Sequence, residues 1–115
     1  MKTITLKKVE IEHFEILQCI AFQSKNSAWD IRMGTNNYSD AYFNSLITID
    51  VANNLILRFR NKIENQNLKF SSIKLKIHEA IILLQCCNNF KEFNPLQKVI
   101  AMKVGNEIHK QLINL

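Results

Sequence analysis

Turn-forming residues are scarce in this chain, which has two glycines and one proline in 115 residues. Sandwiches and barrels of many short strands need frequent tight turns, and glycine and proline form many of these turns. The scarcity of glycine (Gly34 and Gly105) and proline (Pro95) therefore favours helices. With 47% hydrophobic and 22% charged residues, the composition is typical of a folded globular protein. We expect a single domain over residues 1–115, because this length supports one hydrophobic core.

Two stretches have the alternation that is typical of half-buried strands. Over residues 3–9, apolar side chains first alternate with threonine and lysine. Over residues 68–77, isoleucine and leucine alternate with Lys74 and Lys76, which predicts one buried face and one basic face. These stretches are the expected strands of a small sheet.

Three other stretches have the apolar spacing of helices with a buried face. They begin near Glu10, at His78 and at Pro95. The last is the clearest, because Asn94 is a good N-cap, Pro95 suits the first turn, and one apolar stripe continues over residues 95–113. The sequence therefore predicts an α+β fold in which three to four helices pack on a small sheet and a C-terminal amphipathic helix ends the domain.

Residues 46–60 allow two interpretations. They fit two strands joined near residues 52–54, but apolar residues also recur at every fourth position from Val51 to Ile63. No glycine marks the turn of the supposed hairpin. We favour a helix from about residue 50 onward and leave residues 42–49 open.

Residues 26–39 are rich in asparagine and serine and predict a loop. Within this stretch Trp29, Ile31 and Met33 alternate with other residues, which also fits a short strand that ends at Gly34. Both alternatives are kept at this point.

A weak internal similarity links two parts of the chain. Glu12 and Cys19 have the same spacing as Glu79 and Cys86, a glutamine precedes each of these cysteines, and each set follows a predicted strand. The pattern suggests a pair of strand-helix units, although chance also produces three matches in a chain with so biased a composition.

The net charge of +5 makes acidic partners such as nucleic acid plausible. A predicted basic strand lies close in sequence to a predicted arginine-bearing helix, and such a surface can follow a phosphate backbone. The ordinary alternative is a solvated face whose lysines protect a sheet edge, in a chain whose lysine content also fits composition bias. The candidate nucleic-acid-binding residues are Arg58, Arg60, Lys62, Lys69, Lys74 and Lys76.

Large aromatic residues gather around the most irregular segment of the sequence. Aromatic side chains are favoured anchors in protein interfaces, although they also fill cores. A small domain with so many isoleucines and leucines is expected to complete its burial by self-association, most commonly as a dimer. The candidate interface residues are Phe22, Trp29, Tyr38 and Tyr42.

Two pairs of potentially reactive residues lack the spacing that known metal-binding motifs require. His78-Glu79 resembles the start of a zinc-protease helix, but Ile82 occupies the position of the second histidine, and the helix dipole explains Glu79. Cys86-Cys87 lacks the gap that lets two thiolates hold one zinc, so we expect buried cysteines, with Cys87 the more accessible. We predict no catalytic residue, metal or cofactor, and rank an enzyme that uses Cys87 or His78 third among the hypotheses.

The N-terminal residues do not have the pattern of a signal peptide, and no stretch approaches the roughly 20 apolar residues of a membrane span. Three cysteines, with one left over, fit reduced thiols and a cytoplasmic location without a membrane partner. The leading hypothesis is a small non-enzymatic interaction domain that forms a homo-oligomer or binds another protein. The alternative is an accessory nucleic-acid-binding protein.

Overall fold

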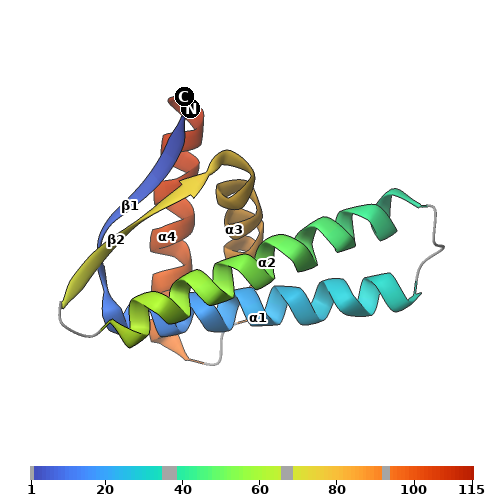
Figure 1. Ribbon diagram of the computed structural model, residues 1–115, viewed down its shortest axis with the longest axis horizontal. Coiled ribbons are helices and arrows are strands. Elements are labelled where there is room, and N and C mark those ends of the chain that lie inside the picture. Colours follow the sequence, from blue (N-terminus) through green and yellow to red (C-terminus); the bar gives the residue numbers. More distant parts are fainter. Residues whose placement is uncertain (1, 35–38, 66–68, 92–93) are drawn as a thin grey trace.

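The protein is described by a computed structural model that covers residues 2–34, 39–65, 69–91 and 94–115. It has an α+β fold, as predicted, in which helices pack beside one antiparallel pair of strands (Figure 1). The elements in chain order are β1 (Thr3–Glu10), α1 (Ile11–Gly34), α2 (Asp40–Glu64), β2 (Phe70–Lys76), α3 (Ile77–Asn89) and α4 (Pro95–Ile113).

Each strand is followed by two helices, so the chain consists of two strand-helix-helix units. Figure 1 shows α1 and α2 as one long hairpin, with α3 and α4 standing across it and the two strands over α4. The strands of the two units pair with each other, with Ile4 opposite Leu75 and Leu6 opposite Ile73. The weak internal similarity suggests two strand-helix units, and the strands of the two units do pair.

The alternation that predicted the strands has the expected burial. Ile73 and Leu75 of β2 are buried and Lys74 and Lys76 are exposed. Strand β1 departs from this regularity, because its pairing with β2 shifts between Leu6 and Val9.

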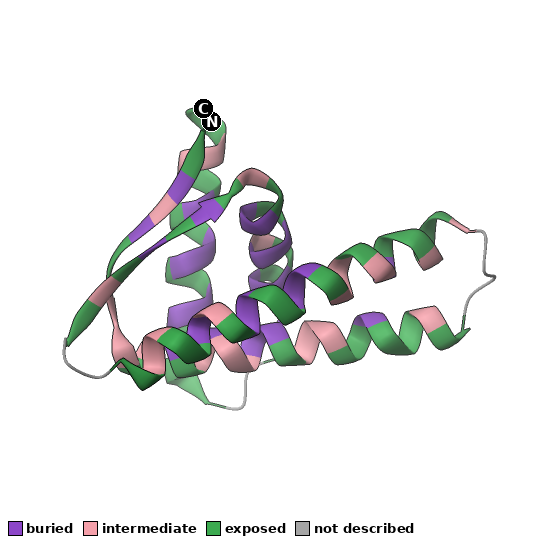
Figure 2. Cartoon of the chain, in the orientation of Figure 1, coloured by how far each residue is buried: buried purple, intermediate pink, exposed green. Residues whose placement is uncertain are grey.

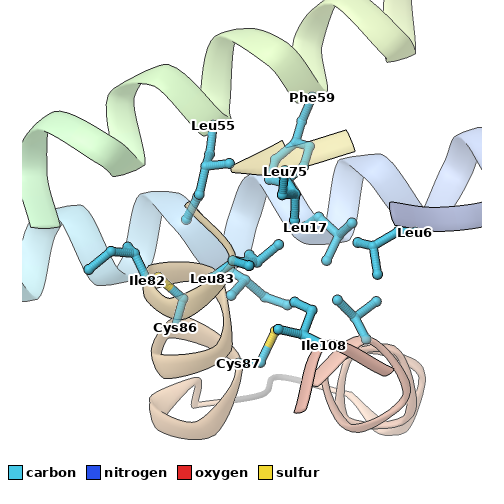
Figure 3. Close-up of a cluster of buried hydrophobic side chains, with 14 of the residues drawn as sticks. Leu6, Leu17, Leu55, Phe59, Leu75, Ile82, Leu83, Cys86, Cys87 and Ile108 are labelled. Carbon is cyan, nitrogen blue, oxygen red and sulfur yellow. The ribbon is translucent and has the colours of Figure 1, made fainter. Parts of the chain in front are cut away.

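The core lies where the two helix layers and the sheet meet (Figure 2). Phe14 of α1 and Phe59 of α2 are fully buried, and their ring centroids lie 6.0 Å apart. Leu83 of α3 and Ile108 of α4 reach the same cluster from the second layer (Figure 3). All six elements contribute buried apolar residues, which is why one core organises the described chain.

The structure settles the alternative at residues 46–60 in favour of the helix and excludes the hairpin. Helix α2 begins earlier than residue 50, at Asp40, because the hydroxyl of Ser39 accepts a hydrogen bond from the Tyr42 backbone N–H and caps the first turn. Residues 42–49 are helical throughout.

Both predictions for residues 26–39 are wrong over residues 26–34, because α1 continues to Gly34. Ala28 of α1 and Ser45 of α2 are buried, and small side chains at such positions let two helices approach closely. Tertiary packing against α2 outweighs the turn preference of the local sequence. The alternating side chains Trp29, Ile31 and Met33 remain exposed.

The last two helices agree with the prediction, and α4 has the predicted bounds. The Asn94 side chain accepts a hydrogen bond from the Gln97 backbone N–H at 2.9 Å, and Pro95 occupies the first turn. Within the described ranges, none of the helices combines the length and apolar character needed to cross a bilayer.

Candidate interaction surfaces

The helical hairpin of α1 and α2 extends well past α3 (Figure 1). We call residues 22–34 of α1 and 40–50 of α2 the outer arm. Its two helix segments pack on each other, while the core cluster lies at the other end of the hairpin (Figure 2). An arm of this kind has more surface for its volume than the rest of the domain.

Large apolar side chains are exposed along one face of α1 in the outer arm. Phe22, Trp29 and Met33 recur at intervals of seven and four residues, which places them on one helix face. Trp29 is 47% exposed and Met33 74% exposed. Ser27 and Ile31 lie on a different face, where they line a cavity with residues of α3. The apolar stripe therefore points away from α3.

Helix α2 has exposed apolar residues on the outer arm as well. Phe43 and Ile47 are about half exposed and lie one turn apart. Tyr42 is half-buried, and its ring packs edge-on against Phe43 with a centroid distance of 5.6 Å. Tyr38 lies outside the described residues.

Charges of both signs flank these apolar residues. The Lys25 ammonium lies 5.9 Å from the centre of the Phe22 ring, and the Arg32 guanidinium lies 4.6 Å from that of Trp29. On α2, Asp40 is exposed in the first turn. The outer arm thus has cations on α1 beside its aromatic rings, and exposed carboxylates on both α1 (Asp30) and α2 (Asp40).

Arg58 has a structural role within the predicted basic set. Its guanidinium contacts Glu79 at 3.0 Å and donates to the Lys74 carbonyl, so it joins α2 to α3 and β2. Glu79 is buried, and it also accepts hydrogen bonds from Asn54 Nδ2 and from the Lys76 backbone N–H, both at 2.8 Å. The helix dipole is therefore only part of the explanation for Glu79.

The other predicted cations are distributed over α2, β2 and the turn before β2. Lys74 and Lys76 are exposed on one face of β2, and Lys62 is partly buried near the end of α2. Arg60 and Lys69 are exposed. Strand geometry places Lys74 and Lys76 together, as the sequence predicted.

The two potentially reactive pairs differ in how far they are buried. His78 is exposed, whereas Cys86 and Cys87 are buried at 2% and 8% exposure. Burial raises the pKa of the Cys86 thiol, and burial with the neighbouring Cys86 raises the pKa of Cys87 to about 12. Both thiols are therefore expected to stay protonated at neutral pH, and Cys87 is, as predicted, the more exposed of the two. Within the described ranges, no three His, Cys, Asp or Glu side chains gather as a metal site would require.

A cavity of about 600 Å³ lies between β1 and one face of α4. The sequence analysis missed this site, although the adjacent lysines Lys7 and Lys8 interrupt the strand alternation and were a usable signal. The lining residues are Thr5, Leu6, Lys7, Lys8, Val9 and His13 from the N-terminal part, and Ile100, Lys103, Val104, Glu107 and Gln111 from α4. We call this cavity the β1–α4 groove.

No protein-family model, curated protein or solved structure matches this chain. The two surfaces with the most distinctive chemistry are the outer arm, which is apolar with charged flanks, and the β1–α4 groove, which is apolar with a basic rim.

Proposed function

We propose that this chain is a non-enzymatic interaction domain that forms a homodimer through the outer arm. The observation that carries the proposal is the row of exposed Phe22, Trp29 and Met33 on α1, together with exposed Phe43 and Ile47 on α2. A monomer gains little from holding such side chains in water, whereas association removes their surface from it.

The exposed area is of the size that a dimer needs. Large side chains of this kind have roughly 150–250 Å² each, so five that are about half exposed leave on the order of 500 Å² uncovered. A standard interface buries about 800 Å² per partner, and the neighbouring polar residues of the arm supply the remainder. A two-fold arrangement of two such arms would form a four-helix bundle.

The charges of the arm favour a second copy as the occupant. Lys25 and Arg32 lie on α1 with the exposed Asp30, whereas Asp40 and Asp50 are exposed on α2. An arrangement in which α1 of one copy faces α2 of the other would bring cations toward carboxylates, and the two-fold axis would repeat every such pair. The presence of both signs of charge on the arm supports a second copy as the occupant.

The test uses sedimentation velocity and light scattering from about 1 to 100 μM protein, a range around the micromolar affinities of moderate interfaces. Trp29→Glu is expected to abolish the dimer, because it places a charge within the apolar stripe. Met102→Glu is the matched control, since Met102 is an exposed apolar residue on α4, away from the arm. A monomer at every concentration would contradict the proposal, as would equal effects of the two variants.

Trp29 also offers a spectroscopic test, because it is the single tryptophan of the chain. Its emission is expected to move to shorter wavelength as the concentration rises and the indole leaves water. The shift should vanish in Met33→Glu, which retains the tryptophan. A constant emission maximum across the association range would place the contact elsewhere.

Nucleic-acid binding is the second candidate function, and the exposed lysine pair of β2 favours it. Lys74 and Lys76 lie opposite Thr5 and Thr3 of β1, so the sheet presents hydroxyl and ammonium groups together. Binding of single-stranded or duplex oligonucleotides is expected to weaken steeply with salt and in a Lys74→Glu/Lys76→Glu variant. Absent or salt-independent binding would reject this candidate.

A further inference from the structure

We propose that the β1–α4 groove binds an extended acidic segment of a partner protein, which adds as a strand to the open edge of β1. This surface differs from the outer arm, and the proposal holds whether or not the arm dimerises.

The edge of β1 that faces away from β2 already binds one amide group. The Thr5 backbone N–H donates to Gln111 Oε1 at 3.0 Å, and Gln111 Nε2 donates to the Thr5 carbonyl at 2.7 Å. A side-chain amide of α4 thus makes the two hydrogen bonds that a peptide group of a neighbouring strand would make. The edge groups of Thr5 therefore point toward α4, and a strand that pairs with Thr5 displaces the Gln111 amide.

A β-bulge lies directly after this point and interrupts the pairing of β1 with β2. Leu6 pairs with Ile73 and Val9 with Ser71, so Ser72 faces both Lys7 and Lys8. One strand residue cannot pair with two, and the extra residue of a bulge loses its partner in the sheet. The Lys8 backbone has a positive φ of 53°, which turns the local chain out of the regular ladder. The groove opens along these residues.

The shape of the groove suits an extended chain. Its α4 wall consists of residues at positions 100, 103, 104, 107 and 111, which form one helix face about 16 Å long. Its other wall is the continuous stretch from Thr5 to Val9. A strand rises about 3.3 Å per residue, so a segment of about five residues spans the groove.

The lining favours an occupant that alternates apolar and acidic residues. Ile100 and Val104 line the α4 wall with apolar side chains that are almost fully buried, and Lys7, Lys8 and Lys103 are exposed cations along the groove. Glu107 is the acidic lining residue, and it accepts a hydrogen bond from Gln111 Nε2 at 2.8 Å. Alternate side chains of a strand point to opposite sides, so one set meets the apolar wall and the other meets the lysines.

The experiment uses a fluorescein-labelled hexapeptide of alternating glutamate and valine with capped ends, and measures its anisotropy during titration with the full chain. We expect saturable binding that weakens with salt, because exposed charge pairs are screened. A matching peptide of alternating lysine and valine is expected not to bind. A glutamate-valine peptide methylated on alternate backbone nitrogens should lose at least tenfold in affinity, because it cannot pair with β1.

Two charge reversals on α4 provide the matched comparison. Lys103→Glu is expected to lower the affinity for the glutamate-valine peptide at least tenfold. Lys98→Glu, on the same helix but outside the groove, is expected to leave this affinity within twofold of the unmodified chain. Amide resonances of Thr5 to Val9 should shift on binding in a ¹H–¹⁵N spectrum. These readouts need no dimer, and Trp29→Glu is expected to bind the peptide normally.

Several results would overturn the proposal. Undiminished binding of the methylated peptide would indicate a site for small anions rather than strand addition. Equal effects of Lys103→Glu and Lys98→Glu would place the contact outside the groove. No binding at millimolar peptide, or an oligonucleotide competing with the peptide for Lys103, would also reject it.

Discussion

The two strand-helix-helix units of this protein share an order of elements but differ in how they use their helices. In the first unit, α1 and α2 have 24 and 25 residues, and the outer arm extends beyond the core. In the second unit, α3 and α4 have 13 and 19 residues and pack across the hairpin of the first. Part of the longer unit therefore extends beyond the core, whereas much of the shorter unit packs against the core.

This difference separates apolar residues that are buried in the core from those that remain exposed to solvent. Leu83 in α3 is fully buried, whereas Met33, in the outer arm, is largely exposed. Hydrophobic residues of similar size thus have different roles according to the unit and the part of the hairpin in which they lie.

The comparison is tested most strongly by truncating one side chain in each region. Phe59→Ala, at the core end of α2, is expected to lower the free energy of unfolding by about 3–5 kcal/mol, and Leu83→Ala by about 2–5 kcal/mol. Met33→Ala should change it by less than about 0.5 kcal/mol in dilute protein. Urea denaturation followed by circular dichroism measures all three variants, and a large loss in Met33→Ala would remove the distinction between arm and core.

A second test addresses the ion pair that joins the units. Arg58→Met removes the cation that pairs with the buried Glu79. It is expected to lower the free energy of unfolding by about 2–3 kcal/mol, because an uncompensated carboxylate remains buried in the protein. Adding Glu79→Gln should recover part of this loss in stability. Urea denaturation of the single and double variants gives the interaction energy between residues 58 and 79. The control is Arg60→Met, since Arg60 is exposed on the same helix. Equal costs for Arg58 and Arg60 would show that the units do not depend on this contact.

The two strands differ as the two units do, because β1 has a bulge and β2 is regular. Lys8 has a positive φ, which costs a residue with a side chain roughly 1 kcal/mol more than glycine. Lys8→Gly is therefore expected to raise the free energy of unfolding by about 1 kcal/mol in urea denaturation. Lys7→Gly, one position earlier, should lower the free energy of unfolding. A lower free energy of unfolding in both variants would mean that the bulge is not strained.

The smallest effect concerns the buried thiols of the second unit. Because burial raises the pKa of Cys86 and Cys87 in the folded state, the unfolded state releases protons first as the pH rises past about 9. Stability should therefore be constant with respect to these thiols below pH 8 and should fall above it, by roughly half a kcal/mol per thiol at pH 9. Unfolding free energies measured between pH 8 and 9.5 should decline less steeply in Cys87→Ala, and an unchanged slope would contradict thiol burial as the cause.

Local patterns in the sequence determined both strands, the helix that follows β2 and the bounds of α4. Alternation of buried and exposed residues and the Asn94-Pro95 capping signal act within a few residues, so they are visible without the fold. Alternation also identified the exposed pair Lys74 and Lys76, while the gathering of aromatic residues drew attention to Phe22 and Trp29, which are exposed. The sequence did not single out Met33, Phe43 and Ile47, because helical segments expose some apolar residues and bury others according to their neighbours.

Tertiary structure alone decided the features that depend on distant partners. Residues 26–34 are helical because α2 packs against them, and Glu79 is buried because Arg58 and Asn54 reach it from α2. The β1–α4 groove joins residues about 100 positions apart, with Gln111 placed against Thr5. No local pattern records such a contact, since it forms only when the second unit folds back over the first.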